Sequence, residues 1–333
     1  MTPGDGLKSL VLRHPHLQEI TVTLQKNEYT KESLLELVNT VKIAEGDERV
    51  RAIVGRITAD LFKTIDEFKV TPDEFWAAAD WITRLGALGQ VGLITAGLGF
   101  DRLLDIMMDE ADEAAGIAAG TPRAIEGPLF VPGAPQFNYE AQLDDDSTLR
   151  GKGKVMVVEG TVFDFEGKPV PNAVIDAWHC NEVGGYSHFF PGMKEHELRR
   201  KIVANENGQY RFRTTIAPGY EIPPTGPVRE LFTALGRHGN RPAHIHFHVV
   251  KPGNRTLTTQ VNIPGDTFID DDFAFATRDG LVLNIEHDVD PAPYASLGIT
   301  APCERAKFDF KMQKAVTEAD TDPRTRVAKA LNQ

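Results

Sequence analysis

The stretch KVMVVEGTVFDFEGKPV (residues 154–170) consists of short runs of β-branched and aromatic residues broken by the dipeptide Glu-Gly. β-Branched and aromatic side chains favour extended backbone, and Gly favours tight turns. Further short runs of the same character follow, separated by turn dipeptides: NAVIDAWHC (172–180), GQYRFRTTI (208–216), HIHFHVV (244–250) and TLTTQVNI (256–263). Several short strands with frequent turns predict a β-sandwich or a β-barrel.

The first hundred residues have the periodicity of helices instead. In residues 47–68 (DERVRAIVGRITADLFKTIDEF) apolar side chains recur every three or four positions and form one helix face. That face comprises Val50, Ile53, Ile57, Leu61 and Ile65.

A second helix is predicted to begin at TPDEFW (71–76), and a third to cover residues 90–112. Thr71 is the N-cap of the second helix, Pro72 is its first residue, and Glu74 reaches back to the cap, which makes a capping box. Its predicted buried stripe consists of Phe75, Ala78, Ile82 and Leu85.

The helical periodicity stops at TPRAIEGPLFVPGAP (121–135), where Pro and Gly recur every few residues. We therefore expect an α+β protein in which a helical N-terminal domain (1–120) precedes a β-sandwich catalytic domain (121–314). A polar tail (315–333) completes the chain.

Composition narrows the class of protein. The 333 residues carry 48 Asp and Glu against 36 Lys and Arg, a formal charge of −12, which disfavours a nucleic-acid partner. The two cysteines, Cys180 and Cys303, are too few for a disulfide scaffold or a thiolate metal site. The N-terminus lacks the apolar region of a signal peptide, and the longest uncharged stretch (85–100) is too short to span a bilayer. We expect a soluble, cytoplasmic protein with no membrane insertion.

The stretch RPAHIHFHVV (241–250) carries the chemistry that stands out. On a strand His244, His246 and His248 point to one side, with neighbouring Cα atoms about 6.6 Å apart. The outer two are about 13 Å apart, so an adjacent pair is the better metal-binding candidate. Spacing alone does not choose between His244/His246 and His246/His248, and all three are also compatible with a polar sheet face that binds nothing.

Two tyrosines indicate which metal the histidines would share. Tyr186 follows paired glycines in NEVGGYSHF, and Tyr220 lies between a Gly and a Pro-containing loop in APGYEIPP. A phenol has a pKa near 10, so it binds as phenolate only to a strongly acidic, hard ion such as Fe(III). Tyrosinate is a known ligand of ferric iron. Each tyrosine alone is equally compatible with a packing or surface position.

From about residue 45 to residue 312 the sequence resembles the intradiol ring-cleaving dioxygenases, most closely the catechol 1,2-dioxygenases. The resemblance rests on six ordered blocks: TPRAIEGPLFVPGAP (121–135), GTVFDFEGKPVPNAVIDAWHCNEVGGYS (160–187), PGYEIPPTGP (218–227), LGRHGNRPAHIHFHV (235–249), LTTQVNIPGD (257–266) and DDFAFATRDGL (271–281).

The resemblance implies one Fe(III) per subunit, with a hydroxide or water as fifth ligand. The implied protein ligands are Tyr186, Tyr220, His244 and His246, and Tyr220 leaves the metal when substrate binds. The position of His248 usually carries an apolar residue in the family, so His248 is interpreted as a local variation. The implied reaction is cleavage of catechol by O2 to cis,cis-muconate, in the β-ketoadipate branch of aromatic catabolism.

The resemblance also assigns residues on the substrate side. Arg241 and Gln260 match positions beside the iron, where Arg241 offers a fixed positive fork for developing negative charge. The implied apolar pocket is lined by Leu93, Ala96, Ile125 and Phe273. Pro242, Asp271, Asp272 and His179 are interpreted as structural.

The family further implies a homodimer through the N-terminal helices, with a phospholipid in the interface. Substrate range stays open among catechol, methylcatechols, chlorocatechols and hydroxyquinol, which differ by small groups. Two readings outside the family also stay open: a zinc hydrolase, and a non-catalytic β-sandwich binding module.

Overall fold

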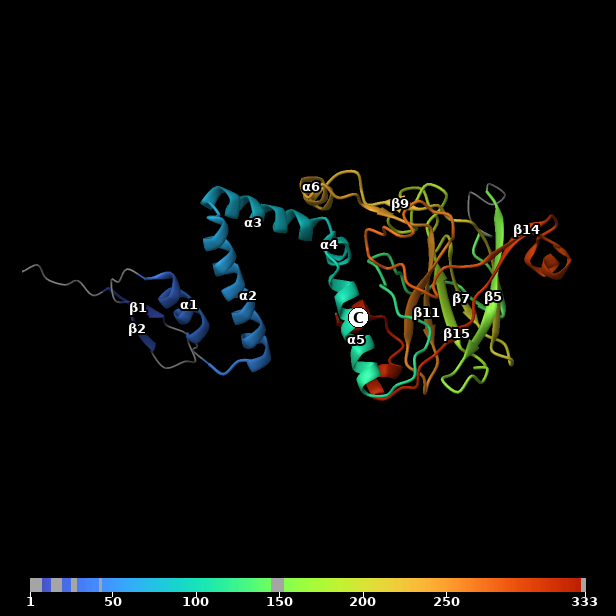
Figure 1. Cartoon of the computed structure of the whole chain (residues 1–333), viewed down its shortest axis with the longest axis horizontal. Coiled ribbons are helices and arrows are strands. Elements are labelled where there is room, and N and C mark those ends of the chain that lie inside the picture. Colours follow the sequence, from blue (N-terminus) through green and yellow to red (C-terminus); the bar gives the residue numbers. More distant parts are fainter. Residues whose placement is uncertain (1–7, 13–19, 25–28, 42–43, 145–152, 331–333) are drawn as a thin grey trace, which may run out of the picture. The chain divides into compact units, whose positions relative to one another are not determined.

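The computed structural model describes residues 8–12, 20–24, 29–41, 44–144 and 153–330 (Figure 1). The chain divides into two compact units, Met1–Ile82 and Thr83–Gln333, and each is described by itself. The division falls inside α3, so the later helices belong with the sheets, whereas the predicted boundary lies near residue 120. The last three residues of the predicted tail lie outside the described residues.

The first unit contains a hairpin and helices. Strands β1 (Lys8–Leu12) and β2 (Ile20–Leu24) pair antiparallel, and α1 (Lys31–Thr40) follows. The hairpin corrects the expectation that this region is helical throughout. Its two segments, KSLVL and ITVTL, are short, and four of the five residues of ITVTL are β-branched, which favours a strand over a helix.

Helix α2 (Glu48–Phe68) confirms the predicted helix. Asp47 caps its N-terminus by accepting a hydrogen bond from the Val50 amide at 2.9 Å, and Lys69 ends it in the left-handed conformation (φ 54°). Its predicted apolar face is left exposed by the residues that the structure describes, since the five side chains of that face are 37–55% exposed.

Helix α3 (Pro72–Ala87) confirms the predicted capping box. The Thr71 amide donates to Glu74 Oε2 at 2.8 Å, and the Glu74 amide donates to Thr71 Oγ1 at 3.3 Å. The predicted buried stripe is wrong except at Leu85, since Phe75, Ala78 and Ile82 are all exposed. Helical periodicity identifies an apolar face, but it does not say whether the same chain covers that face.

The segment predicted as one helix over 90–112 is two helices, α4 (Val91–Gly97) and α5 (Phe100–Ala114). Gly99 separates them with φ 80°, a left-handed conformation that Gly adopts without steric cost.

Two sheets form the second unit and confirm the α+β architecture (Figure 1). All five strands expected from the sequence are present. The first sheet runs β12 (Leu257–Asn262), β11 (His244–Val250), β6 (Val174–Trp178), β7 (Arg199–Val203) and β3 (Gln136–Asn138). The second runs β13 (Ile285–Val289), β14 (Cys303–Lys307), β5 (Val155–Phe163), β8 (Gln209–Thr215) and β4 (Glu140–Gln142), and β15 (Phe310–Lys311) also pairs with β5.

The hydrophobic core lies between the two sheets. Phe247 of β11 approaches Phe212 of β8 with ring centroids 6.1 Å apart, and it meets Phe310 of β15 edge to face at 5.1 Å. These contacts between the two layers make the packed sheets a sandwich.

Short elements connect the strands and helices of the second unit. They are β9 (Tyr220–Glu221), α6 (Pro227–Ala234), β10 (Asn240–Arg241), η1 (Ala292–Leu297), η2 (Glu318–Thr321) and α7 (Arg326–Ala330). The antiparallel pair β9–β10 places Tyr220 directly opposite Arg241.

Cys180 and Cys303 are both free and buried. Across the described ranges no helix combines the length and the apolar character needed to cross a bilayer.

Candidate metal centre

Strand β11 carries apolar residues on one face and histidines on the other. Ile245, Phe247 and Val249 point into the sandwich core and are fully buried. The alternate residues His244, His246 and His248 lie on the opposite face, as the period of two predicts, and each is at most 2% exposed. Three imidazoles are therefore buried outside the core, where each needs a polar partner.

His244 and His246 converge. Their Nε2 atoms are 3.0 Å apart, and their rings meet edge to face. The Nδ1–H of His244 donates to the Pro242 carbonyl at 2.6 Å, which makes Nε2 the ring nitrogen of His244 that carries the lone pair. The His246 ring stacks on Trp178 at 4.9 Å, and within the described part of the chain its buried Nδ1 has no hydrogen-bond partner.

His248 turns away from the other two. Its Nδ1 is 3.1 Å from Thr258 Oγ1, and its Nε2 is 2.9 Å from the carbonyl of Pro323. Both ring nitrogens are therefore engaged by groups on β12 and in the C-terminal segment. The structure thus brings together His244 and His246, and it gives His248 a separate pair of partners.

Both tyrosines face this histidine pair. The Tyr186 hydroxyl lies 3.5 Å from His244 Nε2, and the ring centroids of Tyr220 and His244 are 5.5 Å apart. The two tyrosine rings meet edge to face at 5.5 Å. Gly184 makes this approach sterically accessible, because a Cβ there would lie 2.6 Å from Cβ of Tyr220 and the residue has φ 81°.

Burial keeps all four groups neutral. Desolvation, reinforced by the neighbouring Tyr220, raises the pKa of Tyr186 well above its ordinary value, and desolvation also raises the pKa of Tyr220. Desolvation and then the Arg241 charge lower the pKa of His244 to about 3, and desolvation and then His244 lower the pKa of His246. Two imidazole lone pairs and two phenols in a buried cluster suit a hard, highly charged cation that stabilises phenolate.

Arg241 lies beside the two histidines and two tyrosines and is held in place by hydrogen bonds. Its Nη1 is 3.1 Å from His244 Nε2, and its Nε and Nη2 each donate to the Asp272 carboxylate at 3.1 Å. Burial lowers the pKa of Arg241, but the Asp272 charge outweighs burial and raises the pKa overall, so the guanidinium stays charged.

Asp272 is the residue whose importance the sequence did not reveal. Its carboxylate accepts from Arg241 and also from the amides of Ala274 and Ala276, at 3.0 and 3.1 Å. Burial raises its pKa, but the Arg241 charge outweighs burial and lowers the pKa overall. The only signal in the sequence is an acidic pair directly before apolar residues in DDFAF.

Gln260 completes the polar cluster around Arg241. It lies on β12 directly opposite His246, is fully buried, and accepts a hydrogen bond from Arg241 Nη2 at 2.8 Å. Gln260 thus orients the guanidinium together with Asp272.

A small apolar cavity of about 20 Å³ adjoins the cluster. Its volume holds about one water molecule and not an aromatic ring. All four residues predicted for the pocket line it, together with Arg241, Tyr220 and His246. The complete lining is Leu93, Ala96, Ile125, Gly127, Pro128, Leu129, Tyr220, Ile222, Arg241, His246, Phe273 and Ala274.

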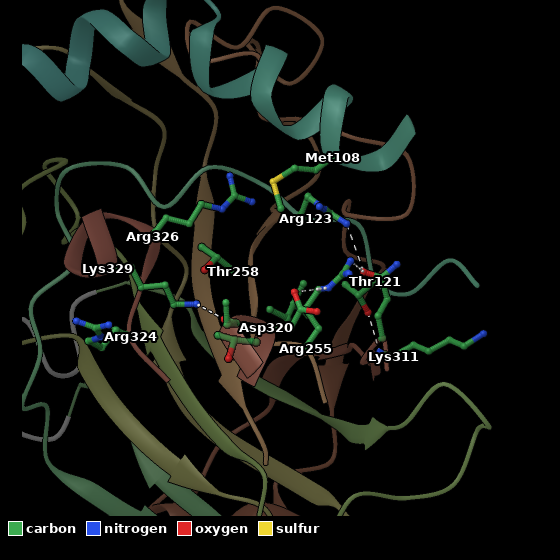
Figure 2. Close-up of a pocket in the computed structure, with 14 residues that line it drawn as sticks. Met108, Thr121, Arg123, Arg255, Thr258, Lys311, Asp320, Arg324, Arg326 and Lys329 are labelled. Carbon is green, nitrogen blue, oxygen red and sulfur yellow. Dashed lines mark hydrogen bonds and ion pairs between the residues drawn. The ribbon is translucent and has the colours of Figure 1, made fainter. Parts of the chain in front are cut away.

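A larger cavity of about 210 Å³ lies elsewhere in the second unit, and cationic side chains surround it (Figure 2). Most of these cations already have carboxylate partners. Arg255 pairs with Asp112 and Asp320 at 2.7 and 3.2 Å, and Arg326 pairs with Asp105 at 2.7 Å. The network ties the C-terminal segment to α5 and to the loop before β12, whereas the convergent metal-binding donors lie beside the smaller cavity.

Comparison with known proteins identifies the family. Residues 125–314 match the family model described as "Dioxygenase", and residues 47–116 match "Catechol dioxygenase N terminus". Catechol 1,2-dioxygenase of Acinetobacter baylyi is 46% identical over 83% of this chain and 88% of its own. Catechol 1,2-dioxygenase 2 of Acinetobacter lwoffii is 49% identical over 77% of this chain and 92% of its own.

Solved structures of catechol 1,2-dioxygenases also match this chain. The crystal structure of wild-type catechol 1,2-dioxygenase from Acinetobacter radioresistens superposes with a TM-score of 0.82 at 40% identity, covering 90% of this chain and 97% of that one. Relatives named hydroxyquinol 1,2-dioxygenase, from Rhizobium and Nocardioides simplex, are 30–31% identical. The matches cover both the helical and the sandwich parts, and the chain therefore belongs to the intradiol dioxygenase family of iron-dependent oxidoreductases.

Proposed function

We propose that this protein is a catechol 1,2-dioxygenase that binds one Fe(III) per subunit and cleaves catechol with O2 to cis,cis-muconate. The observation that carries the proposal is the convergence of two phenols and two neutral imidazoles beside a buried arginine. The proposed ligands are Tyr186, Tyr220, His244 and His246. When bound, ferric iron supplies a Lewis acid that chelates the diol and withdraws electron density from its ring.

Tyr220 is proposed to accept a proton from the incoming diol. Its side chain is only partly buried and lines the cavity, whereas Tyr186 is buried and is not part of the cavity lining. Because the cavity is too small for an aromatic ring, some part of its wall moves when substrate enters. Tyr220 would be held by the metal as phenolate, so taking the proton of the diol returns it to the neutral phenol that this desolvated site favours, and its movement away opens the cavity.

Arg241 is proposed to stabilise negative charge that develops on the substrate. Its guanidinium is buried and held by Asp272 and Gln260, so it needs no reorganisation during the reaction. A preorganised positive charge in a water-poor site acts more strongly than one in solvent.

The remaining walls favour catechol over more polar diols. Leu93, Ala96, Ile125 and Phe273 offer flat apolar contacts that pack on a ring and exclude water. Arg241 is the sole cation of the lining, which includes no carboxylate among its described members. The higher identity to relatives named for catechol than to those named for hydroxyquinol supports the same choice.

Visible absorption tests the proposed ligand set. Iron-loaded protein is expected to be coloured by charge transfer from tyrosinate to Fe(III), and Tyr186→Phe and Tyr220→Phe are each expected to shift or weaken that band. Tyr210→Phe is the matched control, since the Tyr210 hydroxyl donates to the Phe308 carbonyl inside the core. Protein that stays colourless after reconstitution with iron would refute the ligand set.

Gly97 sets the position of one cavity wall. A Cβ at Gly97 would lie 2.3 Å from the ring of Phe273 and 2.5 Å from that of Phe232. Gly97→Ala is therefore expected to push Phe273 toward the cavity and to lower kcat/KM for catechol about tenfold, given an overpacking cost of about 1–3 kcal/mol. Gly86→Ala in α3, where an added Cβ meets nothing within 4 Å, is the control and should leave kcat/KM unchanged.

We also propose that a second copy of the chain covers the apolar face of α2, and that a phospholipid acyl chain occupies the resulting interface. The support is the exposure of this whole apolar face in a single chain.

A further inference from the structure

The loop between Tyr186 and β7 gathers three metal-binding side chains outside the candidate metal centre. One ligand atom each of His188, Glu195 and His196 lies within 4.8 Å of the other two. The two imidazole centroids are 5.2 Å apart, and His196 Nε2 lies 3.7 Å from Glu195 Oε1.

We propose that these three residues form a separate binding site for a first-row divalent transition ion, with Zn²⁺ as its representative. Two imidazoles and one carboxylate are a common ligand set for Zn²⁺, with water in the fourth position. The cluster contains no phenol, so it lacks the donor that selects Fe(III) at the candidate metal centre.

The backbone fixes the two histidines in place. His188 and His196 have φ values of 70° and 56°, in the left-handed region that residues other than Gly seldom occupy. The His196 carbonyl accepts from the Arg199 amide at 3.1 Å and from Arg200 Nη1 at 3.0 Å. Leu198 of the same loop also has a left-handed φ of 57°, so three residues other than Gly hold this loop in an uncommon backbone conformation, and two of them are the proposed histidine ligands.

The three ligand atoms must move slightly closer together to bind one ion. Bonds from Zn²⁺ to nitrogen and oxygen are about 2.0–2.2 Å, which places tetrahedral ligand atoms about 3.3–3.6 Å apart. His196 is mostly buried and held in place, whereas the Glu195 side chain is 77% exposed and free to rotate toward the ion.

The surroundings of His196 favour its neutral imidazole, which is the form that binds a metal ion. Partial burial, and then the neighbouring His188, lower the pKa of His196, so its imidazole is neutral at pH 7. Its Nδ1 is buried without a hydrogen-bond partner in the part of the chain that is described. Arg199 and Arg200 lie near enough to oppose a cation, and the Glu195 carboxylate offsets part of that repulsion.

Calorimetric titration of Zn²⁺ into iron-loaded, full-length protein tests the site. We expect one Zn²⁺ per chain to bind while the ferric absorption band stays unchanged. His196→Ala and Glu195→Gln should each weaken Zn²⁺ binding by about tenfold or more, since even residues that only orient a ligand cost about 10–100-fold.

His287→Ala is the matched control. His287 is exposed and paired with one carboxylate, Glu304, so its removal should leave Zn²⁺ binding unchanged. Equal Zn²⁺ affinity in the unmodified protein and in both loop variants would overturn the proposal, and so would Zn²⁺ uptake accompanied by loss of the ferric band. Retention of that band in the variants also shows that they fold.

Discussion

His246→Ala is expected to abolish iron binding and to reduce kcat for catechol by at least about a thousandfold. His246 offers a buried neutral nitrogen 3.0 Å from that of His244, and an alanine leaves no donor in its place. A Lewis-acid metal contributes several kcal/mol to the transition state, and about 4 kcal/mol corresponds to a factor of a thousand. Iron content per chain and the ultraviolet absorbance of muconate are the measurements.

His248→Ala is the control for that prediction, two residues along the same strand. Its ring nitrogens contact Thr258 and Pro323, so the substitution should leave iron content and kcat intact. Loss of these contacts leaves buried polar groups unpaired and should lower the free energy of unfolding by about 1–3 kcal/mol. Equal loss of iron in both variants would contradict the assignment of His246, and stoichiometric zinc in place of iron would contradict the proposed function.

Arg241→Lys is expected to keep iron bound but to lower kcat about a hundredfold to a thousandfold, the usual effect of removing a preorganised electrostatic donor. The guanidinium contacts Asp272 through two nitrogens and Gln260 through one of them. A lysine ammonium is a single point charge and cannot reproduce this planar fork. Iron content and kcat, measured on the same preparation, separate this effect from ligand loss.

Two further variants test the role proposed for the Arg241 guanidinium. Asp272→Asn removes the negative charge that orients the guanidinium and should lower kcat in the same direction. Arg229→Lys is the control, because Arg229 pairs with the exposed Glu221 at 2.6 Å and does not line the cavity, so this variant should retain kcat. An unchanged kcat in Arg241→Lys would exclude the role proposed for its guanidinium.

Local patterns in the sequence determined the five expected strands, the helix over 47–68, the capping box at Thr71 and the common face of the three histidines. Each depends on a repeat of two or of 3.6 residues, or on a hydrogen bond spanning three residues. The ligand set and the pocket residues came instead from resemblance to a family, because no local pattern joins Tyr186 or Phe273 to the histidines.

Only the tertiary structure decided which side chains meet. Spacing left His244/His246 and His246/His248 equally open, and long-range contacts separate them, because the Pro323 carbonyl lies against His248 while Tyr186 approaches His244. The Asp272–Arg241 pair likewise joins residues 31 positions apart. Such contacts depend on how distant segments pack, which periodicity does not encode, and the same reason explains why the apolar stripe of α3 was recognised while its exposure was not.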